Sequence, residues 1–400
     1  MCLPMSGLHG ELVRWIVANG GRIGPLQIRA VADGQRGIFA LEAIPSDTIL
    51  AEIPPQCTLT LESARRYPIV RSIVEGWPDR RLGQVGLAVF LLEQSRAPSP
   101  WWSAFLESLP RRWDHVSIYF RDEEMRLLEG SVIPFDVARR KTRCREEFAR
   151  VLSIAPELAG ISLDDYLRAR VTVTSRVFCK RQDGAALDAM TPMADMLNHA
   201  TSYDAAWGFD ERGVFLLSSV RPIGKEAEIF CSYGRKSNTS LLMNYGFTLP
   251  DNPNDEATVW ISAPDWDAKA DLRSREFGAL DDGRRRFSLS RRGPEGAGVI
   301  SFLRLAFARG KERHRAMHPA SEEIPLLSER NETAVMEALA HTCRHALRRY
   351  PTTIEEDDAL LAAGAAGNTR NCIVARRGEK AVLRSWTEWA ERGPGAKFEG

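Results

Sequence analysis

The sequence has few cysteines, and their spacing forms no pattern. They are odd in number, seven in 400 residues, and lie at positions 2, 57, 144, 179, 231, 343 and 372. Neither a disulfide framework nor a CxxC zinc site follows from such spacing. His341, Cys343 and His345 form no zinc site either, because on a helix the cysteine points away from the face that the two histidines share. We therefore expect no metal and a reducing compartment.

Long hydrophobic runs are also missing. The longest apolar stretches, which begin at Val85 and Ala359, are well short of the roughly 18 residues that a membrane span needs. The first residues show no basic leader followed by an apolar stretch, and Glu11 comes early. We expect no membrane partner and a cytoplasmic location, with the nucleus as the alternative.

The chain has no excess of charge of either sign. It carries 54 lysines and arginines against 53 aspartates and glutamates, a net charge of +1. No global field therefore draws it to nucleic acid. A P-loop and a GxGxxG turn are absent, which argues against the usual nucleotide-phosphate sites. The 44% hydrophobic content is that of a globular protein with a large core.

Hydrophobic periodicity divides the chain into alternating helical and strand regions. A helical pattern near the N-terminus can end at Asn19–Gly21, and short strand signals follow over 24–54. Helical spacing dominates between about 61 and 167, after which RVTVTSRVF, GVFLLSSV and EAEIFCSYG predict strands. We predict an N-terminal helix over 1–24, a β domain over 25–250 with a helical insert at about 61–167, and a helical domain over 251–400.

Two local patterns lie in the last of these regions. The arginine-rich run GRRRFSLSRRG, which starts at Gly283, has acidic neighbours and is typical of a solvated loop. Thr353 and Glu356 form a capping box, which predicts the start of a helix that Gly364 can end.

Polar residues gather at the ends of apolar runs in two further segments. PMADMLNHA, from Pro192 to Ala200, is followed by EIFCSYGRKSN and NYGF. Strand ends deliver side chains into clefts, so these segments are candidates for a functional site. A thiol nucleophile made of Cys231 and His199 is the weaker alternative, because Cys231 sits within an apolar strand and has no helix N-terminus to lower its pKa. The GQRG turn lets backbone approach a ligand closely, or is a simple hairpin turn.

As an ordered set, GQRGIFALEAI, TSRVF, PMADMLNHA, SYGRKSN and NYGF resemble the motifs of SET-domain methyltransferases. More narrowly they resemble the class of the Rubisco large-subunit lysine methyltransferases, with further matches at SPWWSAFLESLP and NETAVMEALAHTCRHALRRYPTTIEEDDALL. The resemblance implies an α+β fold: a pseudoknotted split β-fold SET domain with a helical insert, plus an all-α C-terminal domain. It also implies S-adenosylmethionine as methyl donor and a protein substrate bound partly by the C-terminal domain.

The resemblance assigns roles to individual residues. Tyr233 falls at the catalytic tyrosine, and Arg176 lies near the carboxylate of the methyl donor. The cofactor-binding residues that it implies are Gly34, Gln35, Arg36, Arg176, Asn198, His199, Tyr245, Gly246 and Phe247. The substrate-binding residues that it implies are Arg176, Asp195, Tyr233 and Tyr245.

The expected function is transfer of methyl groups to lysine side chains of a non-histone protein, by a monomer. Histidine is the alternative target, since this class also includes actin-histidine methyltransferases. Those relatives carry a tryptophan and an asparagine at the target pocket. The corresponding positions here are Ala194 and a residue close to Phe178, which favours lysine. A second alternative is a SET-like module that binds peptide without catalysis.

Overall fold

The computed structural model describes residues 8–31, 36–77, 82–182, 185–262, 279–281, 284–295, 298–317 and 323–399. The chain folds into two compact units. The first consists of Met1–Trp113 and Lys141–Arg235, and the second of Asp114–Arg140 and Lys236–Gly400. Each is described by itself.

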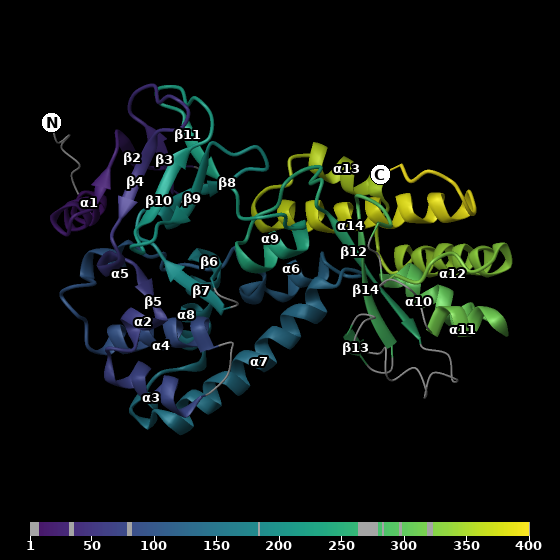
Figure 1. The fold of residues 1–400 in the computed structure, drawn as a ribbon, viewed down its shortest axis with the longest axis horizontal. Helices are drawn as coiled ribbons and strands as arrows, with labels where there is room; N and C mark the ends of the chain where they lie inside the picture. The colour runs from purple at the N-terminus through teal and green to yellow at the C-terminus, as the bar shows by residue number, and fades with distance from the viewer. Residues whose placement is uncertain are drawn as a thin grey trace. The chain divides into compact units, whose positions relative to one another are not determined.

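The first unit is built on an eight-stranded sheet, in which the order along the main path is β1-β4-β10-β9-β11-β3-β2 and β8 pairs with β11 (Figure 1). Its strands are β1 (Arg22–Ile23), β2 (Leu26–Ala30), β3 (Arg36–Ala40), β4 (Ile49–Ile53), β8 (Asn198–His199), β9 (Ala205–Phe209), β10 (Phe215–Ser219) and β11 (Glu228–Cys231). The predicted N-terminal helix is α1 (Leu8–Ala18), and Gly20 follows it at φ +87°. β2, β3 and β4 confirm the strand signals over 24–54, and β10 and β11 confirm those in GVFLLSSV and EAEIFCSYG.

The register of β11 joins distant parts of the chain. β11 pairs antiparallel with β3 through Ile229 and Ile38, and both side chains are fully buried. On its other side it pairs parallel with β8, Cys231 opposite His199. β3 also pairs antiparallel with β2, with Ile28 opposite Ile38. Three chain segments therefore meet side by side in the middle of one sheet.

Helices fill the segment between β5 and β6, and a small sheet of order β5-β7-β6 accompanies them. The elements of this part of the first unit are β5 (Leu59–Thr60), α2 (Leu61–Ala64), α3 (Pro68–Gly76), α4 (Leu82–Arg96), α5 (Ser103–Ser108), α8 (Leu163–Arg176), β6 (Val177–Gln182) and β7 (Ala185–Met190).

The predicted strand RVTVTSRVF is wrong over most of its length, because α8 continues to Arg176 and the strand β6 starts only at Val177. Ser162 caps α8, and its backbone N–H donates to Asp165 Oδ2 in a capping box. α8 then packs along α4, burying Val171 and Val173. Tertiary packing thus overrides the strand preference of β-branched residues.

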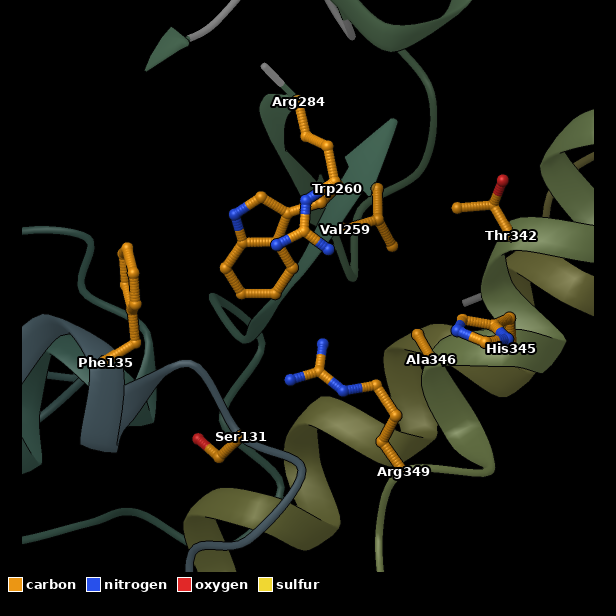
Figure 2. Close-up of a pocket in the computed structure, with 9 residues that line it drawn as sticks. All are labelled: Ser131, Phe135, Val259, Trp260, Arg284, Thr342, His345, Ala346 and Arg349. Atoms are coloured by element: carbon orange, nitrogen blue, oxygen red, sulfur yellow. The ribbon is translucent and has the colours of Figure 1, made fainter. Parts of the chain in front are cut away.

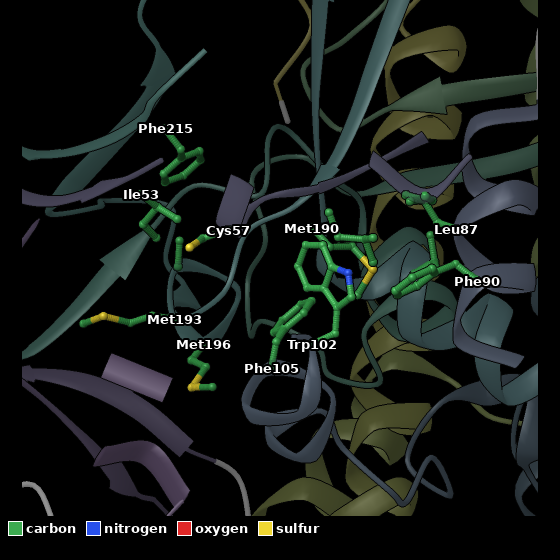
Figure 3. Packing of buried hydrophobic residues seen from close by; sticks show 14 of the residues in the cluster. Ile53, Cys57, Leu87, Phe90, Trp102, Phe105, Met190, Met193, Met196 and Phe215 are labelled. Atoms are coloured by element: carbon green, nitrogen blue, oxygen red, sulfur yellow. The ribbon is translucent and has the colours of Figure 1, made fainter. Parts of the chain in front are cut away.

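The buried hydrophobic residues of the first unit form one continuous core. Figure 3 shows part of it, with Ile53 and Phe215 from the large sheet, Phe90 from α4, and Trp102 from the residue that precedes α5. Met193 and Met196 belong to the same cluster and are 1% and 2% exposed. They flank a short 3-10 turn at Ala194–Met196, so the core anchors this turn at both ends.

The second unit combines helices with a three-stranded antiparallel sheet of order β12-β14-β13 (Figure 1). Its elements are α6 (Asp122–Arg126), the start of α7 (Ile133–Ile154), α9 (Asn238–Asn244), β12 (Glu256–Ser262), β13 (Ala279–Asp281), β14 (Arg284–Ser290), α10 (Gly298–Phe307), α11 (Lys311–Met317), α12 (Glu329–Leu347), α13 (Ile354–Ala362) and α14 (Gly367–Glu391). The α+β fold class is confirmed.

The prediction of an all-α domain after residue 250 is wrong, because β12, β13 and β14 form a sheet there. The arginine-rich run forms β14 and not a solvated loop. Arg285, Phe287 and Leu289 alternate toward the core and are at most 6% exposed. Arg284 and Ser288 on the other face are exposed. The alternation has the period of a half-buried strand, but the charge of the arginines conceals it.

Buried charge holds α13 and α14 together. Asp357, which is fully buried, accepts hydrogen bonds from Arg376 Nε at 3.0 Å and Nη2 at 2.7 Å, and its other oxygen lies 2.7 Å from Lys380 Nζ. The predicted capping box is confirmed: the Thr353 side chain accepts from the Glu356 N–H at 3.1 Å. Gly364, at φ +88°, follows the end of α13. No helix in the described ranges is long and apolar enough to cross a membrane.

Candidate functional site

The site is built around the segment Ala194–His199, which runs from the 3-10 turn into β8. Met193 opens the turn with φ +68° and ψ −54°, a backbone conformation that a non-glycine residue rarely adopts. Its burial holds it in that conformation. The strained turn places Asp195 beside the last residue of α8, so that Arg176 Nη1 donates to the Asp195 carbonyl at 2.7 Å and to Oδ2 at 3.0 Å.

Two guanidinium groups lie near this one carboxylate: Arg176 pairs with it, and Arg36 feels its charge. Burial and the neighbouring charge of Arg176 lower the pKa of Arg36, while Asp195 acts in the opposite direction. Arg36 Nη2, Arg176 Nε and Asp195 Oδ1 are buried and have no hydrogen-bond partner among the described residues. Buried polar atoms are normally paired, so unpaired donors with a net positive charge fit an anionic ligand group.

Asn198 ties two strands together. Its Nδ2 donates to the Arg36 carbonyl of β3 at 3.1 Å and to Glu228 Oε1 of β11 at 2.6 Å. Gly37 leaves the space for this arrangement, because a Cβ on Gly37 would lie 2.3 Å from Glu228 Oε1 and 3.2 Å from Asn198 Nδ2. Asn198 is only half-buried, so the amide is held in place while part of the residue remains open to a ligand.

His199 and Tyr233 form the other end of the site. Their rings stack at a centroid distance of 5.1 Å with 22° between the planes, and the Tyr233 N–H donates to His199 Nδ1 at 3.1 Å. The Tyr233 hydroxyl donates to the Leu197 carbonyl at 2.7 Å. The stacked ring and the two hydrogen bonds fix the phenol oxygen next to a backbone carbonyl. The Tyr233 hydroxyl oxygen and the Leu197 carbonyl oxygen thus lie next to each other, and neither group is a strong base.

Cys231 does not take part as a nucleophile. Its side chain is 2% exposed, and burial raises its pKa to about 12. A thiol with such a pKa is almost entirely protonated at neutral pH. The thiol nucleophile, the weaker alternative from the sequence, is therefore not supported.

The first unit therefore brings together Arg36, Arg176, Asp195, Asn198, His199 and Tyr233. Gly34 and Gln35 lie outside the described residues. Tyr245, Gly246 and Phe247 follow α9 in the second unit, where the two aromatic rings lie 6.2 Å apart. Gly246 has φ +80° there, and a Cβ would lie 2.6 Å from the carbonyl oxygen of His115. Glycine is required at this position by both conformation and space.

Three features of the site were missed from the sequence. Glu228 receives the Asn198 amide, and only the alternation of polar and apolar residues in β11 could have marked it. The side chain of Arg36, and not only its backbone, carries charge into the site. His9 of α1 also lies near Arg36: burial and that charge lower its pKa, and its Nδ1 is buried without a hydrogen-bond partner in the described chain. No sequence pattern pointed to His9.

The described residues contain no cluster of three or more His, Cys, Asp or Glu side chains arranged to hold a metal ion. The polar groups that converge in the first unit instead suit an organic ligand with an anionic end. Unpaired guanidinium donors would face that end, and the Asn198–His199 backbone with the Tyr233 hydroxyl would face the rest.

Comparison with known families gives two matches along the chain. The SET domain matches residues 35–234, which is half of the chain, and the Rubisco LSMT substrate-binding family matches residues 265–383. The first match contains all six residues that the first unit brings together. The second covers β14 and most of the helices of the second unit.

Individual relatives match over most of the chain at low identity. The actin-histidine N-methyltransferases of Callithrix jacchus and Homo sapiens are each 24% identical over 410 aligned residues. These alignments cover 93% of this chain and 66% of each relative, so the chain spans slightly less than two thirds of their length.

Solved structures share the fold. A crystal structure of the SET domain of LSMT bound to lysine and AdoHcy superposes with a TM-score of 0.78 at 22% identity, covering 98% of this chain and 92% of that one. Rubisco LSMT bound to AdoMet superposes with a TM-score of 0.78, also at 22% identity, over 97% and 92% of the two chains. At this identity the likeness establishes the fold.

Proposed function

This chain belongs to the SET-domain family, and from that premise we propose that it transfers methyl groups from S-adenosylmethionine to a side chain of a protein. The observation that carries the proposal is the Tyr233 hydroxyl held 2.7 Å from the Leu197 carbonyl, directly beside Asn198 and His199. A methyl donor of this kind supplies a methyl group bound to a positively charged sulfur. Oxygen atoms fixed around such a carbon stabilise it through weak C–H···O contacts.

The chain's own residues would position the reactants. The free donors of Arg36 and Arg176 suit the carboxylate of the methyl donor, and the Asn198–His199 backbone suits its remaining polar groups. Gly34, Gln35, Tyr245, Gly246 and Phe247 are proposed to complete that site on the resemblance alone. Tyr233 is proposed as the catalytic residue, with Arg176, Asp195 and Tyr245 at the entry of the target side chain. Alignment in a dry channel accounts for most of the rate enhancement in an in-line displacement.

We propose lysine as the target. An imidazole needs a hydrogen-bonding partner to fix its ring, whereas a lysine presents an apolar stem and needs an apolar channel. Ala194 is a 2% exposed methyl side chain, and the Phe178 ring packs edge-on against Trp207 and Phe215 at 5.1 and 5.0 Å. Neither residue can donate or accept a side-chain hydrogen bond. Both differ in this from the tryptophan and asparagine of the histidine-directed relatives.

Histidine is the second candidate, and the observation that favours it is the 24% identity with the actin-histidine N-methyltransferases. In either case the substrate is proposed to be a non-histone protein that also contacts the second unit, which matches the Rubisco LSMT substrate-binding family. We further propose a monomer that acts in the cytoplasm, with the nucleus as the alternative compartment.

The test is transfer of labelled methyl from S-adenosylmethionine into a lysate of the source cells, followed by hydrolysis of the labelled protein. We expect N-methylated lysine, and methylated histidine in its place would refute the lysine assignment. Tyr233→Phe is expected to lower the rate at least about 100-fold, the loss typical of removing one polar group that is aimed at the transition state. Tyr203→Phe removes a hydroxyl from a side chain that is 40% exposed and serves as the matched control.

A null result is interpretable only if the protein still binds the methyl donor. Calorimetry with S-adenosylmethionine gives this control. Binding without transfer into any lysate protein would favour a SET-like module that binds peptide, and no binding would refute the proposed function altogether.

A further inference from the structure

The second unit contains a pocket outside the site described above. It has a volume of about 200 Å³ and lies between β12, β14, the end of α12 and the start of α7. Figure 2 shows Arg284 and Arg349 extending toward Trp260 from opposite sides, with Phe135 on one flank and His345 on the other. Trp260 and Phe135 meet edge to face at 6.0 Å. The pocket thus has an aromatic wall and cationic groups at its mouth.

The cations of this pocket are available to a ligand. The Arg349 guanidinium lies 5.3 Å from the centre of the Trp260 ring, which orients it without neutralising it. Within the described part of the chain, Arg349 and Arg284 form no salt bridge. Arg349 is the more favourable ligand of the two, because the Trp260 ring holds its guanidinium in place.

Two carboxylates beside the lining residues Phe135 and Ser131 are already paired with other groups. Asp136 forms a bidentate pair with Arg286 at 2.6 and 2.7 Å. Glu379 is buried behind Ser131, from which it accepts a hydrogen bond at 3.0 Å, and it accepts another from the Tyr350 hydroxyl at 2.9 Å. Burial raises the pKa of Glu379, so it presents less negative charge than an ordinary glutamate. The mouth of the pocket therefore keeps an excess of positive charge.

Size and charge together restrict what can enter. A volume of about 200 Å³ is smaller than the 300–1,000 Å³ of typical cofactor and nucleotide pockets, but it holds one or two side chains. Nucleic acid would need an extended basic surface, whereas this chain has a net charge of +1 and the pocket offers two guanidinium groups. A carboxylate side chain, with an apolar neighbour against the aromatic wall, matches both properties.

We infer that this pocket binds an acidic segment of the protein substrate, with a glutamate or aspartate side chain held by Arg349. The inference rests on the proposed function for the identity of the partner as a substrate. The binding event itself does not require methyl transfer, so the two can fail separately.

The direct test measures fluorescence anisotropy of a fluorescein-labelled hexaglutamate peptide with the full chain. Arg349→Glu is expected to weaken binding at least tenfold. The matched control is Arg348→Glu, which makes the same charge change one residue earlier, at an exposed position that does not line the pocket. We expect that control to stay within threefold of the wild type. Equal weakening by both variants, or no binding by the wild type, would overturn the inference.

Two further arms keep the result unambiguous. Trp260→Leu tests the aromatic wall and is expected to weaken peptide binding severalfold, with melting temperatures of all variants recorded to confirm folding. A labelled uridine dodecamer tests for nucleic acid, and RNA binding that is as tight as peptide binding and equally sensitive to Arg349→Glu would overturn the choice of an acidic peptide.

The connection to catalysis is tested once a substrate is identified. Arg349→Glu is expected to raise KM for the protein substrate while leaving kcat unchanged, because the pocket contributes binding and not chemistry. A fall in kcat at constant KM would overturn the role as a docking site. If no methyl transfer occurs but hexaglutamate binding depends on Arg349, the proposed function fails and the acidic-peptide site stands.

Discussion

Replacing Gly37 with alanine tests how the site holds Asn198. The new Cβ would lie 2.3 Å from Glu228 Oε1, so the carboxylate must move away. A carboxylate at the end of a flexible side chain moves at little cost, and we expect the free energy of unfolding to fall by no more than about 1 kcal/mol. The movement does, however, break the 2.6 Å hydrogen bond from Asn198 Nδ2 to Glu228.

The expected loss falls on ligand binding. A hydrogen bond to a charged group contributes about 1.5–3 kcal/mol, and the 3.2 Å approach of the same Cβ to Asn198 Nδ2 displaces the amide further. If half of that free energy orients Asn198 for the methyl donor, the Kd for S-adenosylmethionine rises roughly fourfold to tenfold in the variant. Gly37→Ala should therefore weaken S-adenosylmethionine binding while leaving the protein folded.

Calorimetric titration with S-adenosylmethionine and thermal melting are the assays. Gly208→Ala is the matched control, because Gly208 lies in β9 of the same sheet and a Cβ there would meet nothing within 4 Å. Should Gly37→Ala bind the ligand as tightly as Gly208→Ala does, Asn198 would not depend on Glu228 for its position. A large loss of melting temperature in Gly37→Ala alone would show that the space beside Glu228 serves the fold.

Other predictions concern pH and buried charge. A lysine substrate has a pKa near 10.4, so its rate of methylation should rise steadily between about pH 7 and pH 9, and a flat profile at saturating substrate would argue against lysine. Burial raises the pKa of Asp255 from 3.8 to about 7, so the stability linked to its proton is complete below pH 3.8 and is lost as the pH rises through about 7. The free energy of unfolding of Asp255→Asn, measured with urea, should then rise relative to that of the wild type by up to about 4 kcal/mol between about pH 4 and pH 8. If the two proteins showed the same dependence of stability on pH, the raised pKa would be contradicted. Asp357→Asn leaves Arg376 and Lys380 without a counter-charge and should lower the free energy of unfolding by about 3–5 kcal/mol. The neighbouring Asp358→Asn, in an exposed pair, should cost less than about 1 kcal/mol, and similar losses in both variants would refute the special role of the buried pair.

Much of the fold could be predicted because its signals are local. The α1 helix, the hairpin of β2 and β3, and the capping box at Thr353 each depend on residues within a few positions of one another. The predictions that failed concern segments in which the local signal is misleading. Arg170–Arg176 is rich in β-branched residues and still forms a helix, because packing against α4 decides its conformation. β14 was missed because the charge of its arginines conceals an alternation of buried and exposed residues.

The site was predicted to a similar extent and for a related reason. Motif order marked Asp195, Asn198 and Tyr233, which the first unit gathers in one place. Glu228 and His9 were missed, because each contributes through a partner far away in sequence and neither belongs to a motif. Local sequence thus identified the residues that the fold gathers better than the residues that hold them in position.

The pairing of β3 with β11 has a consequence for how the protein reaches its native state. The two strands are joined through Ile38 and Ile229, with all the helices of the insert between them in the chain. The early hairpin of β2 and β3 therefore keeps an unpaired edge until the last strand of the first unit has been synthesised. Such long-range closure slows folding, and it leaves nascent chains that end before Glu228 exposed to aggregation and without the complete candidate site.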